Sequence, residues 1–190
     1  IRVTTGVCMD AAGNDNLAAT DLTRTYDSQA PAVLGVTRIG ATPTNAATVD
    51  FTVTFSEAVT GVDVTDFVLD ASGVMGASFS GISGSGDTYT VTVNTGAGSG
   101  RVSVDVANDG TIRDAVGNAM ALVFTDGEAY GIDKSRPVPG ISSTAGSPTG
   151  ISPIPVAVSF SEPVSGFSAD DLTTDNCAIA NFSGTGTAYG

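Results

Sequence analysis

The stretch VDFTVTFSEAV at residues 49–59 decides the fold of this chain. Its apolar residues alternate with polar ones, so that Phe51, Val53 and Phe55 fall on one face of an extended strand and the threonines between them fall on the other. This alternation predicts a strand that has one face in a core and the other toward solvent.

The same alternation recurs between breaks that are rich in glycine, serine and asparagine. Outward from this stretch, the runs predict strands near 33–39, 48–56, 65–70, 75–81, 88–94, 101–106 and 120–131, with glycine-rich segments such as SGSGD at 83–87 as turns between strands. Seven short strands in about 100 residues are typical of an immunoglobulin-like β-sandwich. The fold class that we expect is therefore all-β.

An internal repeat organises the chain. The stretch 49–67 matches PVAVSFSEPVSGFSADDL at 155–172, where Glu162 corresponds to Glu57 and Gly166 to Gly61. The period is close to 105 residues, and the chain is out of phase with it. We therefore expect strands F and G of one partial unit in 1–30, one complete immunoglobulin-like unit in 31–135, and the N-terminal strands of another partial unit in 136–190.

Composition excludes several function classes. The formal net charge is −13 with only seven Lys plus Arg, so nucleic acid and an anionic membrane surface are poor partners. The absence of histidine excludes serine–histidine and cysteine–histidine catalysis within this chain, and zinc sites of the usual Cys/His type. We expect no enzyme and no membrane insertion in this segment, while divalent cations suit so many carboxylates.

Several stretches resemble the bacterial immunoglobulin-like (Big-type) tandem repeats of large secreted and surface adhesins: FTVTFSEAVTG, FSEPVSGFSADDLT, CAIANFSGTGTAYG, VCMDAAGN and RTYDSQAPAV. The complete unit departs from that pattern, because its NDGTIRDAVGNAM is longer and it has no cysteine. The resemblance implies an extracellular protein at the bacterial cell surface, in which such units are structural modules of an adhesin or filament and are often stiffened by calcium.

A loop with the same Asp, Gly and Asn appears twice, as DAAGN at 10–14 and DAVGN at 114–118. In an immunoglobulin-like unit with strands A to G, the start of strand A lies at the same end as the BC and FG loops. In this chain we expect Glu57 in the BC loop and DAVGN in the FG loop. We therefore expect a calcium site at the junction with the preceding unit, made by the residues Asp27, Glu57, Asp114 and Asn118. The alternative is that these are ordinary turn residues that bind no metal.

The repeat extends this expectation to the neighbouring junctions. Asp133 and Glu162 correspond to Asp27 and Glu57, and Asp10 and Asn14 correspond to the acid and amide of the FG loop. The partners are then neighbouring units of the same protein. Identical chains could also complete one another head to tail by strand addition, and the residues leave open whether the chain is an excerpt of a longer array.

The two cysteines, Cys8 and Cys177, align with the apolar residues Ile112 and Val74 of the complete unit. A disulfide and an aliphatic pair fill similar space, so we expect a disulfide between equivalent halves of neighbouring segments. Two buried free thiols are the alternative. For the chain as a whole, a carbohydrate- or surface-binding module is the alternative to a structural repeat, although the chain has no tryptophan with which to stack on a sugar.

Overall fold

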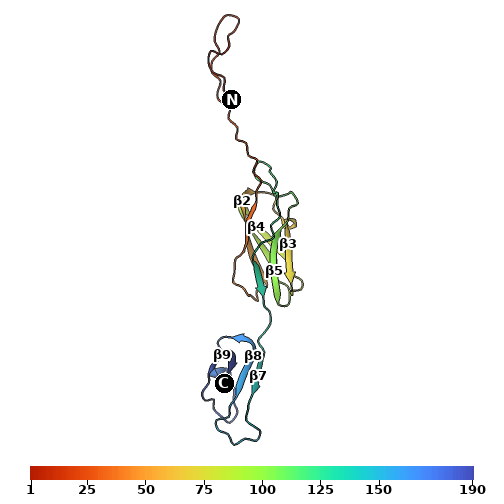
Figure 1. The fold of residues 1–190 in the computed structure, drawn as a ribbon, viewed down its shortest axis with the longest axis vertical. Helices are drawn as coiled ribbons and strands as arrows, with labels where there is room; N and C mark the ends of the chain where they lie inside the picture. The colour runs from red at the N-terminus through yellow and green to blue at the C-terminus, as the bar shows by residue number, and fades with distance from the viewer. The chain divides into compact units, whose positions relative to one another are not determined.

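The computed structural model describes residues 1–190, and the prediction of an all-β fold is confirmed (Figure 1). The elements in chain order are β1 (Val33–Arg38), β2 (Thr48–Val59), η1 (Val64–Asp66), β3 (Phe67–Ser72), β4 (Ser78–Asn94), β5 (Gly100–Val106), β6 (Ala129–Ile132), β7 (Pro139–Ser142), β8 (Ala157–Val164), η2 (Ala169–Asp171) and β9 (Gly184–Tyr189). The chain divides into two compact units, Ile1–Ile132 and Asp133–Gly190. No helix is long and apolar enough to cross a membrane.

The first unit contains a sandwich of two antiparallel three-stranded sheets. One sheet has the order β1-β2-β4 and the other β3-β5-β6. Both contribute to a single core, because Phe51 of β2, Val91 of β4 and Val102 of β5 are each fully buried in it. The core residues are mostly valines and phenylalanines, which pack well on the pleated surface of a sheet.

The alternation in β2 is confirmed by its burial. Phe51 and Val53 are 0 % exposed and Phe55 is 1 % exposed, whereas the threonines between them are half-buried. Across the sheet, Phe51 pairs with Val91 and Val53 with Tyr89 of β4. The apolar residues of the two strands therefore share one face, and that face closes on the second sheet.

The glycine-rich segment SGSGD at 83–87 lies at the tip of a hairpin within β4, so the prediction of a turn between two strands is confirmed. Ser80 Oγ donates to Thr92 O at 3.3 Å, and Met75 and Ala97 form an antiparallel bridge. Residues 12 positions apart in one extended strand would be about 40 Å apart, so β4 folds back on itself, and its two arms correspond to the predicted strands 75–81 and 88–94. Gly84 and Gly86 have φ values of +124° and +72°, which side chains other than glycine rarely adopt and which suit a tight turn.

The predicted strand 120–131 is largely irregular, and only β6 at its end is a strand. Upstream of β6, the chain touches the sheet at separate points. Met120 N donates to Ile112 O at 2.9 Å, and Phe124 forms an isolated bridge with Val106. Single apolar residues of this segment, such as Met120 and Phe124, contact the sheet at separate points. The sequence therefore alternates as it does in a strand, although no continuous row of backbone hydrogen bonds forms.

Residues 1–30 form no regular strand, but the segment folds back on itself. Met9 and Asp15 form an isolated antiparallel bridge, and Asn16 N donates to Cys8 O at 2.9 Å. Further along, Ala19 N donates to Val3 O at 3.0 Å. The apolar side chains here are largely solvent-exposed, including Tyr26 at 88 %.

The second unit is a three-stranded antiparallel sheet of order β7-β8-β9. It repeats the pairing of β1, β2 and β4 in the first unit, including a register shift in β8 between Ser159 and Val164. One face carries an aromatic cluster in which rings meet mainly edge to face, formed by Phe160, Phe167, Phe182 and Tyr189. The internal repeat is thus visible in strand pairing as well as in sequence.

Candidate metal centre

The loop that contains Asp114 is organised by its own carboxylate. Asp114 Oδ1 accepts hydrogen bonds from the backbone N–H groups of Val116, Gly117 and Asn118 at 2.9, 2.7 and 2.8 Å. Gly117 has a φ of +98°, which lets the chain turn tightly around this oxygen. The side chain is 5 % exposed. The sequence DAVGN therefore places one acid at a fixed position.

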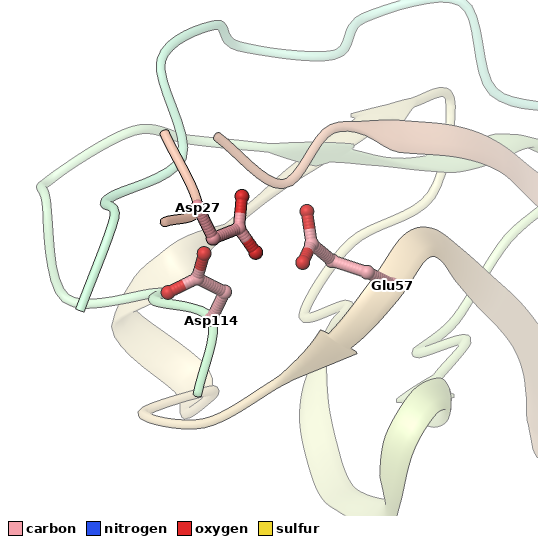
Figure 2. A group of neighbouring side chains, drawn as sticks. All are labelled: Asp27, Glu57 and Asp114. Carbon is pink, nitrogen blue, oxygen red and sulfur yellow. The ribbon is translucent and has the colours of Figure 1, made fainter. Parts of the chain in front are cut away.

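Two further carboxylates converge on this one, as Figure 2 shows. Glu57 comes from the end of β2, and Asp27 from the segment that precedes β1. One oxygen of each of the three carboxylates lies within 4.8 Å of the others. Two oxygens that bind one Ca²⁺ at 2.3–2.6 Å can be at most about 5 Å apart, so one ion could touch all three.

The electrostatics of the cluster favour a bound cation. No salt bridge joins any of the three carboxylates to a lysine or arginine. Burial raises the pKa of Glu57, and the charges of Asp114 and Asp27 raise it further. The pKa of Asp114 is lowered. Burial acts in the opposite direction, but the hydrogen bonds from Asn118, Val116 and Gly117 outweigh it. The lowered pKa of Asp114 favours its ionised form. Glu57 lies close to the negative charges of Asp114 and Asp27, which a bound cation would neutralise.

Asn118 lies at the cluster but acts as a donor. Its Nδ2 donates to Asp114 Oδ2 at 2.7 Å and to the backbone oxygens of Gln29 and Asp27 at 3.0 and 3.4 Å. These contacts tie the segment before β1 to the FG loop without any metal. Asn118 as a metal ligand stays a prediction, and the contacts observed are those of a residue that positions the linker.

The loop at 10–14 has the same internal bonds but lacks partner carboxylates. Asp10 Oδ1 accepts from Ala12 N and Asn14 N, and Asp10 Oδ2 accepts from Asn14 Nδ2 at 2.9 Å. The hydrogen bonds from Asn14, foremost among several, lower the pKa of Asp10. All five residues of the loop are exposed. The predicted ligands Asp10 and Asn14 are therefore arranged like their counterparts, with no third acid beside them.

Asp133 and Glu162 show half of the same arrangement. Asp133 Oδ1 accepts from Ser135 N at 3.0 Å, as Asp27 Oδ1 accepts from Gln29 N at 3.0 Å. Ser161 Oγ accepts from Val138 N, as Ser56 Oγ accepts from Ala32 N. No group of three acidic residues forms there. The hydrogen bonds around Asp133 and Ser161 thus repeat those around Asp27 and Ser56. They do not bring a cluster of acidic residues together at the predicted second site.

The two cysteines are free and exposed. The counterpart of Cys177 is Val74. Its chain neighbours Ser72 and Met75 pair with Arg101 and Ala97, so Val74 lies at the end of the sandwich where β5 begins. The counterpart of Cys8 is Ile112, whose neighbour Arg113 pairs with Thr60 at the opposite end. The complete unit therefore lends no support to the expected disulfide, which stays a prediction.

Sequence reasoning missed one buried polar group. Asp66 is 0 % exposed, and its Oδ2 accepts from Asp63 N at 2.7 Å in the cap of η1. Thr111 Oγ1 lies 2.7 Å from Asp66 Oδ1 and joins η1 to the FG loop. Burial raises the pKa of Asp66 above its usual range. The signal in the sequence is the spacing of Asp63 and Asp66, which suits a capping box.

Comparison with known proteins identifies one region. Residues 133–190 match the model of the family described as Bacterial Ig-like domain (Big_12). No curated protein and no solved structure matches the chain. The matched region is the one that contains β7, β8 and β9. The resemblance to Big-type immunoglobulin-like domains is confirmed for this region.

Proposed function

We propose that this chain, which carries a bacterial immunoglobulin-like domain at residues 133–190, is a structural spacer of an extracellular adhesin or filament and that calcium stiffens the junction before its complete unit. The observation that carries the proposal is the cluster of Asp27, Glu57 and Asp114. The cluster links the segment that enters the sandwich to the end of β2 and to the loop at 114–118. The three carboxylates come from the entering linker, a strand end and a loop, so a role in holding the chain suits the cluster better than catalysis.

Calcium is the cation that this donor set suits. Hard cations prefer carboxylate and carbonyl oxygens, and calcium accepts six to eight of them in flexible geometry. Asp27, Glu57 and Asp114 offer six carboxylate oxygens, some of which are engaged by backbone donors. A bound ion would relieve the repulsion that raises the pKa of Glu57. It would also fix Asp27 relative to the sandwich, and so fix the direction in which the chain enters.

The linker already has contacts that an ion would complete. Asn118 holds the backbone at Gln29 and Asp27, and Ala32 N donates to Ser56 Oγ at 3.0 Å. A segment tied at these points needs only a small further restraint to become stiff. A spacer gains from such stiffness, because a rigid junction costs less conformational entropy when a distant tip binds its target.

The test is a calcium titration of the full chain by calorimetry, with thermal unfolding alongside. Calcium should bind and raise the melting temperature. The gain in the free energy of unfolding should reach about 2.7 kcal/mol when free calcium is 100 times its dissociation constant. Glu57→Gln should weaken binding strongly, whereas the matched charge loss Asp126→Asn, at an exposed residue outside the cluster, should not. Absence of any calcium effect would refute the stiffening and leave the spacer role standing. Failure to find the protein outside intact cells would refute that role.

A further inference from the structure

The first and last strands of the sandwich lie side by side and run in the same direction. Glu128 N donates to Val36 O at 2.9 Å, and Thr44 N donates to Gly131 O at 2.9 Å. Thr44 and Ile132 form a parallel bridge. These contacts join β1 and its continuation to β6 and so connect the two sheets, since the two strands belong to different sheets.

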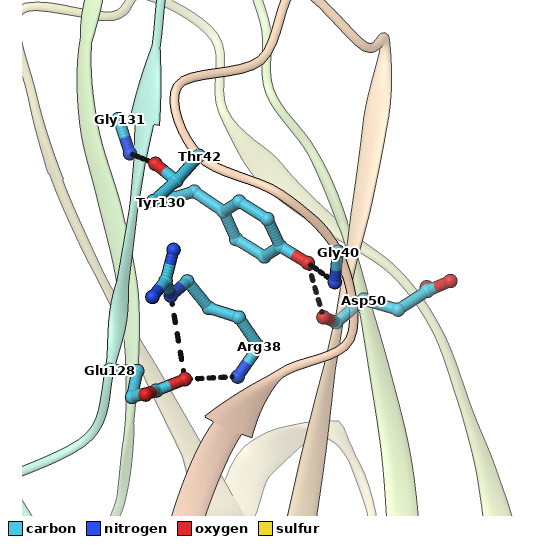
Figure 3. Close-up of polar contacts among 7 residues, drawn as sticks. All are labelled: Arg38, Gly40, Thr42, Asp50, Glu128, Tyr130 and Gly131. Atoms are coloured by element: carbon cyan, nitrogen blue, oxygen red, sulfur yellow. Dashed lines mark hydrogen bonds and ion pairs between the residues drawn. The ribbon is translucent and has the colours of Figure 1, made fainter.

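Side chains strengthen this contact, as Figure 3 shows. Tyr130 Oη accepts from Gly40 N at 2.7 Å and donates to Asp50 O at 3.2 Å, so one side chain of β6 reaches the chain on both sides of the β1–β2 turn. Thr42 Oγ1 accepts from Gly131 N at 2.7 Å. We call the contacts of residues 36–44 with residues 128–132 the β1–β6 seam.

A charged pair adds a further link within the β1–β6 seam. Glu128 Oε2 accepts from Arg38 N at 2.8 Å and lies 3.4 Å from Arg38 Nε. The guanidinium of Arg38 lies over the Tyr130 ring, 5.7 Å from its centroid. The side chain of Arg38 is 24 % exposed, so the pair is shielded from solvent more than an ordinary surface salt bridge.

The chain enters and leaves the sandwich at opposite ends of the β1–β6 seam. At the entry, Ala32 lies beside Ser56, near the end of β2. At the exit, Ile132 lies beside Thr44 and Gly100. Tension between the two ends would therefore pull β1 and β6 past each other, which loads all bonds of the seam together. Bonds at a single end of an antiparallel pair would instead open one after another.

We propose that the β1–β6 seam is the element that resists stretching of the complete unit, with Tyr130, Thr42 and Glu128 as its principal side chains. The biological use of this resistance rests on the proposed spacer function, because only a spacer that links a cell to a target carries tension. The resistance itself depends on the geometry of the seam alone. Forced unfolding is governed by the rate of unfolding, so it reports on the contacts that must break first.

The chain provides its own attachment points for the experiment. Cys8 and Cys177 are its two cysteines, both are exposed, and they flank the complete unit. Handles attached to these thiols allow the full chain to be held at constant force in the presence of a calcium chelator. Unfolding of the complete unit is recognised by the length that it releases, on the order of 300 Å for Val33–Ile132.

Two tyrosines give a matched pair of variants. Tyr130→Phe removes the contacts to Gly40 N and Asp50 O within the β1–β6 seam. Tyr89→Phe removes an equivalent buried contact to Val59 O, 3.0 Å long, between the antiparallel strands β4 and β2. We expect Tyr130→Phe to shorten the lifetime under force about tenfold and Tyr89→Phe to leave it unchanged within about twofold, although both lower stability without force.

Thr42→Val is a second test at an exposed position, where folding is not at risk. It should also shorten the lifetime under force, because Gly131 N loses its acceptor. Equal effects of the two tyrosine variants, or no effect of Tyr130→Phe and Thr42→Val, would overturn the proposal. Adding calcium separates the two proposals: if calcium changes nothing while Tyr130→Phe still weakens the unit, the calcium junction is wrong and the seam stands.

Discussion

The loop at 112–120 and its copy at 8–16 have the same backbone hydrogen bonds and opposite surroundings. Asp114 N donates to Asn118 O at 3.1 Å, and Asp10 N donates to Asn14 O at 3.0 Å. Ile112 is 1 % exposed, whereas its counterpart Cys8 is exposed. The comparison shows that the loop forms from its local sequence, and that the cluster of acids forms only where a sandwich surrounds the loop.

The largest difference in the free energy of unfolding should come from the apolar residues that precede the two loops, Ile112 and Cys8. Ile112→Ala leaves a cavity in the core and should cost about 2–5 kcal/mol of the free energy of unfolding. Cys8→Ala removes an exposed side chain and should change it by less than about 0.5 kcal/mol. Urea denaturation of the full chain, followed on the transition of the complete unit, measures both. Similar values for the two variants would mean that the environments of the loops do not differ as described.

The acids of the two loops should differ in calcium binding. Asp114→Asn removes a charge from the cluster of three, so the dissociation constant for calcium should rise more than about tenfold. Asp10→Asn removes the corresponding charge where no other acid converges and should leave the dissociation constant unchanged. Calorimetric titration of each full-length variant gives the values. A comparable loss in Asp10→Asn would place the ion at the loop alone.

The amides of the two loops sharpen the comparison further. Asn118→Ala removes donors to Asp114 Oδ2 and Gln29 O and should lower stability by about 0.5–1.5 kcal/mol. It should also increase backbone motion at Gln29, which NMR relaxation reports. Asn14→Ala should affect only its own loop, because Asn14 Nδ2 is bonded to Asp10. Unchanged order at Gln29 in Asn118→Ala would show that the linker is held by other contacts.

The smallest effect should come from Glu57, for which the loop at 8–16 has no counterpart. Its pKa is raised in the folded state, so folding favours its protonated form and stability from this group is lost as pH rises through that pKa. Without calcium, Glu57→Gln should therefore raise the melting temperature at pH 7 by about 1–4 °C. Below the pKa of an unfolded glutamate, the gain should vanish. Thermal unfolding against pH in a chelator measures this, and a gain that persists at low pH would contradict it.

Much of the cluster could be predicted from the sequence. The repeat aligned Glu57 with Glu162, and the loop DAVGN pointed to Asp114, because Asp, Gly and Asn have local conformational preferences that do not depend on the fold. The donor role of Asn118 could not be predicted, since it depends on the backbone of Gln29, far away in the chain. The turn at SGSGD, by contrast, could be predicted, because glycine adopts the positive φ values that this turn requires.

The sequence by itself determined the all-β class, the repeat, the alternation of β2 and the shape of the Asp–Gly–Asn loop, since each follows from the chemistry of neighbouring residues. Only the tertiary structure decided which copy of the loop meets Asp27 and Glu57, and that Arg38, Glu128 and Tyr130 lie together in the β1–β6 seam. Those contacts join residues far apart in the chain. They exist because two sheets bury a common core, which brings the first and last strands side by side.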